Sequence, residues 1–371
     1  DSQIFIGSYA INTSGWAEGK TNMTIFANDS AGNIERLLLT YIIDNTPPIV
    51  TFNKPSAKQV VRGIFRVNVT STDALSNISG LTFAFNGSQN FTMNRTSPSI
   101  ISDYFYDWNT TNTSDKEYIL KINGNDTANN IKFEPRFTTV DNTAPGVRLE
   151  SPSNSTASRT RQNTFTFAVF ELNNLNNCTL LINGSINFTS TSLTKNASNS
   201  ISVNLSDGAY RWNLNCSDEA VDTNGERNYG TNSTDYMISV DTIIPMMNMS
   251  LNDSSLARNE IANVTANVTD ESSLSFCQFI VNQSGINKFH NKSVSGKNDQ
   301  CSQNITIDVG SGNVINFTVI VNDTANNQNE SSRIFTVIDN VRPNSNASLN
   351  DTSIELREIV NMTANVSDDL A

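Results

Sequence analysis

Charged residues and histidine are scarce in this sequence. Lys, Arg, Asp and Glu make up 16% of its 371 residues, and a single His is present. A Ser-His-Asp or Cys-His site would therefore have to use His290 as its base. His290 lies in the polar stretch NKFHNKSVSGKND, where we expect a solvated loop histidine. GSGN at 310 lacks the Lys and the helix of a phosphate-binding loop. We expect no enzymatic activity.

Clusters of basic residues and long apolar runs are also missing. The chain has 24 Lys and Arg against 36 Asp and Glu. Because phosphate binding needs clustered Lys and Arg, we expect no nucleic-acid partner. No apolar run approaches the ~20 residues that span a bilayer, so we expect no membrane span in this window. The chain opens at DSQIFIG without a signal peptide, and we expect it to be a processed or excerpted piece of a longer protein.

Polarity comes instead from Asn, Ser and Thr, which alternate with apolar residues. IANVTANVT at 261–269 is the clearest case, and FRVNVTSTD and VNMTANVSDD repeat the pattern. Successive side chains of a strand point to opposite faces, so this alternation predicts half-buried antiparallel strands. Val264, Ala266 and Val268 should face a core while Asn263 and Asn267 face solvent. A 3.6-residue helical period does not fit.

Many of these Asn residues begin the acceptor sequence for N-glycosylation, Asn-x-Ser/Thr. Roughly thirty such sequons occur, although a chain this rich in Asn, Ser and Thr also makes some by accident. The Asn and the hydroxyl residue share one strand face, which leaves the middle residue free to be core. Other sequons fall in turns, as at Asn28, Asn125 and Asn322. The candidates for glycosylation are Asn22, Asn68, Asn90, Asn187, Asn204, Asn263, Asn267, Asn304, Asn316, Asn361 and Asn365.

The sequence repeats itself with a period of roughly 100 residues, a length typical of immunoglobulin-like sandwiches. DNTPP, DNTAP, DTIIP and DNVRP each place a Pro four residues after an Asp, at Asp44, Asp141, Asp241 and Asp339. We number the resulting segments as five repeats: 1–45, the C-terminal part of one; 46–142, 143–242 and 243–340, complete; and 341–371, the N-terminal part of another. The Pro residues should stiffen the linkers.

A second motif predicts a hairpin before each linker. NDSAGN at 28, NDTANN at 125 and 322, and NCSDEA at 215 follow alternating strands, and TNMTIFA pairs naturally with RLLLTYIID across such a turn. FAFNGSQNFT and LINGSINFT predict an earlier hairpin with Asn-Gly at its tip. The third repeat departs from the pattern because its loop is longer, DEAVDTNGERNYG. Several short strands with regular turns and no helix predict an all-β Greek-key sandwich in each repeat.

The pairing of D-x-A-G/N-N with a closing D-n-t-x-P resembles the tandem immunoglobulin-like repeats of archaeal and bacterial cell-surface glycoproteins. The resemblance spans nearly the whole chain. It implies a linear rod of sandwiches outside the cell, of the surface-layer, filament or adhesin type. It says little about activity.

Four cysteines fall as one pair in the third repeat and one pair in the fourth. Cys178 and Cys216 occupy the middle positions of sequons, which points them inward, and Cys301 shares parity with Ile305 and Ile307. We predict the disulfides Cys178–Cys216 and Cys277–Cys301, which suit an oxidising compartment. Buried free thiols are the alternative. Zinc is disfavoured because there is no C-x-x-C.

Two features could carry binding. Tyr104, Phe105, Tyr106 and Trp108 in DYFYDW could stack on sugar, but core or interdomain packing is the stronger expectation. Oxygen-rich turns near the linkers raise the question of calcium at the junctions. Each junction offers few acidic residues along the chain, and turn chemistry already accounts for Asn and Asp. We expect no cofactor except covalent N-glycans, with calcium as the alternative left open.

The two ends resemble complementary parts of one repeat. They fit either a window cut from a longer array or a composite sandwich formed head to tail between copies. The sequence therefore predicts a non-enzymatic structural glycoprotein of the microbial cell exterior, part of a filament, surface layer or stalk. Its expected partners are neighbouring copies in a linear or lattice assembly, and cell-surface polysaccharide if it is an adhesin. A passive stalk of an exported enzyme is the third interpretation.

Overall fold

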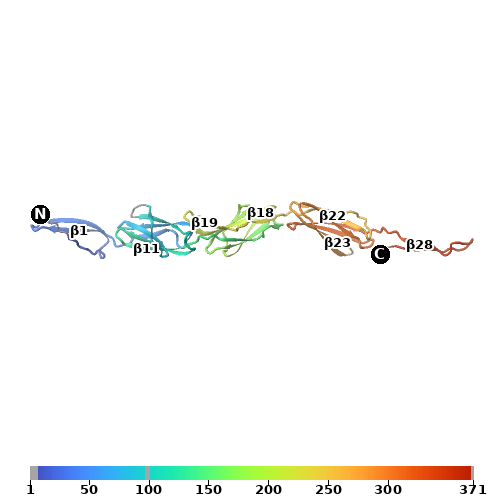
Figure 1. Cartoon of the computed structure of the whole chain (residues 1–371), viewed down its shortest axis with the longest axis horizontal. Helices are drawn as coiled ribbons and strands as arrows, with labels where there is room; N and C mark the ends of the chain where they lie inside the picture. Colours follow the sequence, from blue (N-terminus) through green and yellow to red (C-terminus); the bar gives the residue numbers. More distant parts are fainter. Residues whose placement is uncertain (1–6, 97–100, 284, 369–371) are drawn as a thin grey trace.

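The computed structural model describes residues 7–96, 101–283 and 285–368. The chain is a linear rod in which the repeats follow one another along a single axis (Figure 1). Regular structure in the described residues is strand throughout. Within those residues, none forms a helix long and apolar enough to cross a membrane. The architecture is therefore all-β, with tandem immunoglobulin-like sandwiches, as the alternation predicts.

The second repeat packs two antiparallel sheets around one core. One sheet has the strand order β3 (Ile49–Lys54), β5 (Ile64–Thr72), β9 (Ile101–Asn109), β8 (Asn94–Arg95). The facing strands are β4 (Val60–Val61), β11 (Ile131–Val140), β10 (Lys116–Asp126), β6 (Ile78–Phe85) and β7 (Phe91–Thr92). Short β4 runs parallel to β11, so the chain crosses from the first sheet to the second before β5.

The third repeat repeats this plan. Its smaller sheet has the order β12 (Gly146–Ser151), β14 (Gln162–Phe170), β17 (Ala197–Asn204). The other sheet contains β13 (Thr156–Ser158), β15 (Leu175–Ile182), β16 (Ser185–Ser190), β18 (Gly208–Val221), β19 (Arg227–Thr231) and β20 (Tyr236–Val240). Strand β18 pairs with β19 and β20 at successive positions, so two short strands replace the single last strand of the other repeats.

The fourth repeat and the two partial repeats complete the rod. The fourth packs the sheet β21 (Met246–Leu251), β22 (Ile261–Thr269), β25 (Asn298–Thr306) on the sheet β24 (Ile286–Ser293), β23 (Leu274–Gln283), β26 (Val314–Asp323), β27 (Gln328–Thr336). The partial repeats are hairpin β1 (Gly19–Asn28) with β2 (Ile34–Ile43), and hairpin β28 (Asn344–Leu349) with β29 (Met362–Ser367).

The predicted strand faces are confirmed in β22. Val264, Ala266 and Val268 are 0% exposed and belong to the core of the fourth repeat. Asn267 is exposed and Asn263 is half-buried on the opposite face. Two-residue periodicity therefore sorts this strand into a core face and a solvent face.

The predicted hairpins are also present. β1 pairs with β2, and β26 pairs with β27, through the five-residue Asn- and Asp-rich turns. At the Asn-Gly tips, Asn86 and Gly87 have φ of 42° and 77°, and Asn183 and Gly184 have φ of 52° and 77°. These left-handed values match the turn that suits the twist of a two-residue hairpin.

Both predicted disulfides are present. Cys178 and Cys216 face each other on neighbouring strands β15 and β18, with their Cα atoms 4.0 Å apart. Cys277 on β23 and Cys301 on β25 join the two sheets of the fourth repeat across its core. All four are buried, and no cysteine is free in the described chain.

The aromatic residues of DYFYDW lie mostly in the core, which confirms the expectation of packing over the alternative of stacking on sugar. Tyr104 and Trp108 are each 2% exposed, and Tyr106 stacks on Phe83 with ring centroids 5.1 Å apart. Phe105 points outward and lies under the guanidinium of Arg66 at 4.4 Å.

The expectation of a loop around His290 is wrong. This residue lies on strand β24 and pairs with Phe279 of β23. The polar composition of NKFHNKSV hid the strand because β24 is an edge strand of its sheet.

Candidate functional site at the repeat junctions

Three carboxylates meet at each of three junctions in the described chain, and one oxygen from each lies within 4.8 Å of the other two. The first comes from the linker Asp, the second follows the second long strand of the next repeat, and the third lies on or just after that repeat's penultimate long strand. The clusters are Asp44, Asp73 and Asp126; Asp141, Glu171 and Asp218; and Asp241, Asp270 and Asp323. Each cluster thus joins a linker to the repeat that follows it.

The linker Asp is fixed by a local turn. Its Oδ1 accepts the backbone N–H two residues later, at 3.1 Å from Thr46, 3.0 Å from Thr143 and 3.0 Å from Ile243. This Asx-turn orients the carboxylate before any contact with the next repeat is made.

One Asn in each complete repeat ties the linker to the following turn. The side-chain amide of Asn130 donates to the backbone carbonyl of Asp44 at 3.1 Å and to the Asp126 carboxylate at 2.9 Å. The equivalent distances for Asn228 are 3.1 Å to Asp141 and 2.9 Å to Asp218, and for Asn327 they are 3.0 Å to Asp241 and 2.7 Å to Asp323. The same bridge is therefore built three times.

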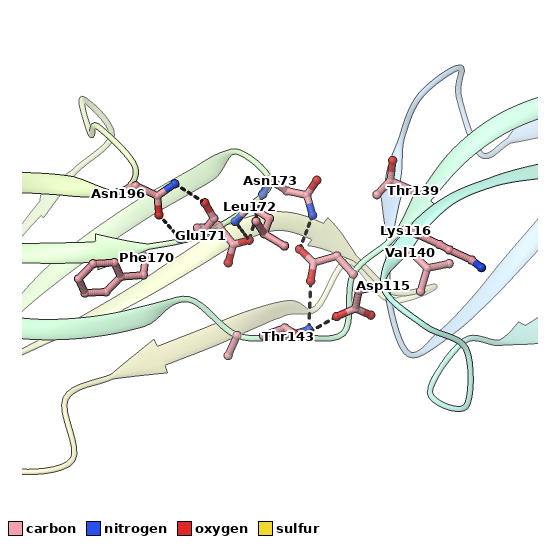
Figure 2. Close-up of a pocket in the computed structure, with 12 residues that line it drawn as sticks. Asp115, Lys116, Thr139, Val140, Thr143, Phe170, Glu171, Leu172, Asn173 and Asn196 are labelled. Carbon is pink, nitrogen blue, oxygen red and sulfur yellow. Dashed lines mark hydrogen bonds between the residues drawn. The ribbon is translucent and has the colours of Figure 1, made fainter.

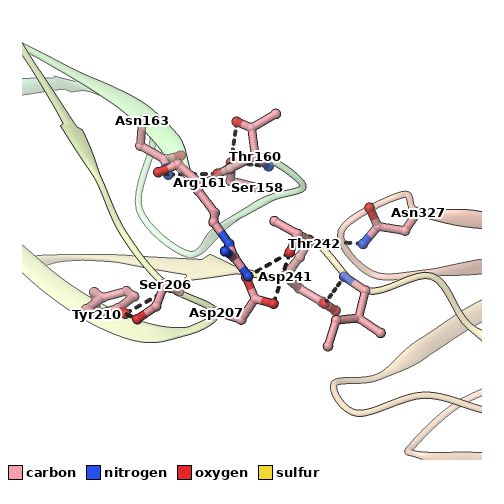
Figure 3. Close-up of polar contacts among 11 residues, drawn as sticks. Ser158, Thr160, Arg161, Asn163, Ser206, Asp207, Tyr210, Asp241, Thr242 and Asn327 are labelled. Carbon is pink, nitrogen blue, oxygen red and sulfur yellow. Dashed lines mark hydrogen bonds and ion pairs between the residues drawn. The ribbon is translucent and has the colours of Figure 1, made fainter.

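Hydroxyl groups of the linkers bind back to the preceding repeat. The Thr46 hydroxyl donates to Glu18 at 2.5 Å, and the Thr143 hydroxyl donates to Asp115 at 2.5 Å (Figure 2). At the third junction the Thr242 hydroxyl lies 3.0 Å from the carboxylate of Asp207 (Figure 3). Each linker is therefore held on both sides, which keeps successive repeats in line.

The second junction has an additional clasp, made by the long loop of the third repeat. Val221 of β18 extends the sheet onto β4, where the Arg62 N–H donates to the Val221 carbonyl at 3.0 Å. Thr223 then donates its N–H and its hydroxyl to the Ile64 carbonyl at 3.0 and 2.8 Å, and its hydroxyl accepts the Arg66 N–H at 2.7 Å. The strands of the second and third repeats thereby form one eleven-stranded sheet.

Burial and mutual repulsion disturb the carboxylates of these clusters. Burial raises the pKa of Asp218 to about 6, the Asn228 amide opposes the rise, and the Asp141 and Glu171 carboxylates add to it. Burial also raises the pKa of Asp323 above its ordinary value. Asp29 occupies the same turn in the first repeat, where it is exposed and where hydrogen bonds from Asn33 lower its pKa. The turn alone thus stabilises the ionised carboxylate, whereas burial at the junction destabilises it.

Two of the three clusters contain carboxylate oxygens without a partner. Oδ2 of Asp44 and Oδ2 of Asp241 are buried and accept no hydrogen bond from the described residues, and the same holds for Oδ2 of Asp270. Asp44 is 9% exposed and Asp241 is 5% exposed. In the middle cluster the Asn173 amide instead donates to Oδ2 of Asp141 at 2.8 Å. The middle junction therefore differs chemically from its neighbours.

The expectation that each junction offers few acidic residues is wrong. Sequence reasoning singled out the linker Asp and the turn Asp, and it missed Asp73, Glu171 and Asp270. The available signal was an acidic residue directly after an alternating strand, as in NVTD at 267–270. The oxygen-only donor sets are those that hard cations prefer, because they contain neither His nor Cys.

Nine of the eleven glycosylation candidates lie on strands, and Asn90 and Asn361 directly precede β7 and β29. None of the eleven is buried; Asn68, Asn263 and Asn316 are half-buried and the other eight are exposed. Asn322, expected in a turn, instead lies on β26 and is 1% exposed, so its side chain is inaccessible in the folded repeat. Whether any of these sites carries a glycan stays a prediction.

Residues 48–122 match the family model described as bacterial Ig domain. Three multidomain structures are similar to the chain at low identity. A tetra-tandem repeat from the extending region of a large adhesion protein has 14% identity and a TM-score of 0.34, covering 88% of this chain and 84% of that one. A Ca2+-stabilized adhesin with which an Antarctic bacterium binds ice has 14% identity and a TM-score of 0.35, covering 86% and 82%. The D1–D4 ectodomain fragment of ICAM-5 has 10% identity and a TM-score of 0.41, covering 86% and 84%.

No curated protein matches the chain. The two intrachain disulfides are typical of proteins that fold in an oxidising environment. Together with the match of residues 48–122 to a bacterial Ig domain, they indicate an extracellular protein built from immunoglobulin-like repeats.

Proposed function

We propose that this chain is a non-enzymatic structural segment of a glycoprotein on the exterior of an archaeal or bacterial cell, where it serves as a spacer in a filament, surface layer or stalk. One observation carries the proposal: the same hydrogen-bonded junction is built three times along one axis. A repeated junction of fixed geometry keeps the ends of the segment at a defined separation and direction. A flexible linker of the same length would leave both variable.

The outward strand faces support the glycoprotein part of the proposal. On β22 and β25, Asn263, Asn267 and Asn304 lie on the solvent face opposite a closed core. Glycans there add bulk and hydration without disturbing the fold, and they shield strands from edge-to-edge association. The partners we propose are neighbouring copies of the chain in a linear or lattice assembly.

Location and organisation in the native cell test the proposal. We expect an antibody against residues 143–242 to label intact cells, and electron microscopy to show the label at regular intervals on a filament or a lattice. Label confined to the cell interior would overturn the proposal. Label outside the cell without any periodic arrangement would overturn the structural role and leave only the location.

Adhesion is the alternative function. The stretch DYFYDW offers little for it, because Tyr104 and Trp108 lie in the core and are unavailable for stacking on sugar. A glycan array on the folded second repeat and its neighbours separates the two functions. Specific retention of one polysaccharide class would favour the adhesin, and uniform absence of binding would favour the spacer.

A further inference from the structure

We propose that the junctions at Asp44 and at Asp241 each bind one Ca2+ ion, and that the middle junction at Asp141 does not. The ligands are the carboxylates of Asp44, Asp73 and Asp126 at one site, and those of Asp241, Asp270 and Asp323 at the other. The ion would join the linker to the repeat that follows it. This inference goes beyond the proposed spacer role and does not depend on it.

The oxygen atoms of each cluster are close enough together to share one ion. Ca2+ binds oxygen at 2.3–2.6 Å, so two of its ligands lie at most about 5 Å apart. The oxygens of each cluster are within 4.8 Å of one another, which places all three within reach of one ion. They come from three separate segments, so the site exists only when the linker is seated on the folded repeat.

Independently of the clustering, both sites contain buried carboxylate oxygens that have no hydrogen-bond donor among the described residues. Asp241 is 5% exposed, and its Oδ1 is committed to the Ile243 N–H while its Oδ2 accepts nothing. Asp270 is arranged in the same way, since Oδ1 accepts from Ser272 and Oδ2 is left over. A buried anionic oxygen without a donor is costly, and a bound cation removes that cost.

At the Asp44 junction, too, one carboxylate oxygen accepts a turn N–H and the other has no donor. Oδ1 of Asp44 accepts the Thr46 N–H, and the buried Oδ2 has no donor among the described residues. Oδ1 of Asp73 accepts the N–H groups of Leu75 and Ser76 at 2.9 and 2.8 Å. In each site, local turns thus use one oxygen of the linker Asp and one of the second Asp.

The middle junction serves as an internal contrast. Asn173 donates its amide to Oδ2 of Asp141, the oxygen that is unpartnered at the other two junctions. Glu171 stands where the other two clusters have the shorter Asp, and its Oε1 accepts hydrogen bonds from the N–H groups of Leu172 and Asn173. Protein donors thus reach both oxygens of Asp141 and of Asp218, and the β4–β18 clasp holds this junction instead of a metal ion.

The ligand chemistry selects the metal ion. Six carboxylates and no His or Cys form the two sites, which disfavours zinc and copper. Ca2+ tolerates irregular sites of six to eight oxygens that water and backbone carbonyls can complete, whereas Mg2+ demands a near-octahedral set.

The test is calorimetric titration of CaCl2 into the chelator-treated 371-residue chain, with MgCl2 as a second probe. We expect two equivalents of Ca2+, one of which is lost in Asp241→Asn and the other in Asp44→Asn. Asp29→Asn is the matched control, because Asp29 occupies the same turn without partner carboxylates, and it should keep both equivalents. At a hundredfold excess over the dissociation constant, Ca2+ should raise the unfolding midpoint of the affected repeats by on the order of 10 °C.

The unfolding midpoint of the variants without metal is a separate measurement, and we expect it to stay equal or to rise. Without metal, Asp241→Asn removes one of three like charges, so its unfolding midpoint should equal or exceed that of the wild type, and only the Ca2+-induced rise should disappear. If Asp241→Asn does not fold, Asp270→Asn tests the same site. Absence of Ca2+ binding, or binding unchanged in both site variants, overturns the proposal. A third equivalent overturns the exclusion of the middle junction, and equal binding of Mg2+ overturns the assignment to calcium.

Discussion

The side-chain amide of Asn327 joins the backbone carbonyl of Asp241 to the carboxylate of Asp323, with distances of 3.0 and 2.7 Å. The first contact spans a repeat junction and connects residues 86 positions apart. Because Asn327 is 8% exposed, water cannot replace it. The same residue type makes the same bridge at Asn130 and Asn228, so the relationship defines the junction rather than one copy of it.

Replacing this Asn should weaken the junction. We expect Asn327→Ala to lower the free energy of unfolding of the fourth repeat by about 1–3 kcal/mol, since both acceptors lose a buried donor. Chemical denaturation of the full chain measures the change. Asn33→Ala is the matched control, because Asn33 makes the turn contact to Asp29 at an exposed position. Equal losses in both variants would show that the turn matters and the bridge does not.

The clasp between the second and third repeats should depend on one hydroxyl. Thr223→Val keeps the side-chain shape and the backbone N–H bond to Ile64, but it removes the hydroxyl's bonds to the Ile64 carbonyl and from the Arg66 N–H. We expect a loss of about 1–2 kcal/mol from the unfolding of these two repeats. Thr324→Val alters the corresponding turn of the fourth repeat and should change stability by less than about 0.5 kcal/mol. An unchanged unfolding midpoint in Thr223→Val would show that the Thr223 hydroxyl does not stabilise the junction.

A single glycine permits close contact between a linker and the next repeat. A Cβ on Gly230 would lie 1.7 Å from the carbonyl oxygen of Pro145, so the backbone must move apart. We expect Gly230→Ala to destabilise the third repeat by about 1–3 kcal/mol or more. Gly80→Ala is the control, because nothing lies within 4 Å of its added Cβ. Differential scanning calorimetry compares the two, and a tolerated Gly230→Ala would mean that the linker is not held there.

Acidification should stabilise the middle junction. The pKa of Asp218 is about 6 in the folded repeat and 3.8 at its ordinary value, so between these values the folded state binds more protons. Its contribution to stability is therefore full below about pH 4 and is lost as pH rises through 6. In chelator, the unfolding free energy should be greater at pH 5 than at pH 7.5 by about 1 kcal/mol from this group.

Glu171→Gln is the control for this pH dependence. It removes the neighbouring charge while its remaining oxygen still accepts from Leu172 and Asn173. Because part of the rise in the pKa of Asp218 comes from that charge, the difference between pH 5 and pH 7.5 should shrink. An identical difference in wild type and variant would place the titrating group elsewhere.

Glycan occupancy should follow exposure rather than the sequon alone. We expect glycopeptide mass spectrometry of the native protein to find glycan at Asn267 and Asn304, which are exposed, and a bare Asn322, which is 1% exposed. Full occupancy at Asn322 would show that modification precedes folding of the fourth repeat. Bare peptides at all three would contradict the glycoprotein proposal.

Much of the fold could be predicted because two-residue alternation is a local signal. The burial of Val264 beside the exposure of Asn267, the left-handed Asn86 and the inward parity of Cys178 follow from neighbours in sequence. The edge strand carrying His290 escaped prediction because both of its faces are largely exposed, so its sequence needs no apolar–polar alternation.

The junction clusters could not be predicted because they depend on folding across long distances. Asp241, Asp270 and Asp323 lie on a linker, after one strand and at the end of another, and only the sandwich brings these segments together. The sequence does show that the loop DEAVDTNGERNYG of the third repeat is longer than the matching turn of the other repeats. Its role as a clasp depends on where β18 points once folded, which periodicity does not specify.

The eleven-stranded sheet gives the rod unequal mechanical properties along its length. Main-chain bonds between β4 and β18 make the second and third repeats one stiff body, whereas the third and fourth are joined through side chains and a linker. A pulling force would thus open the boundaries near Asp44 and Asp241 before the one near Asp141. If calcium sits there, extracellular ion concentration would set how much load the array bears before it lengthens.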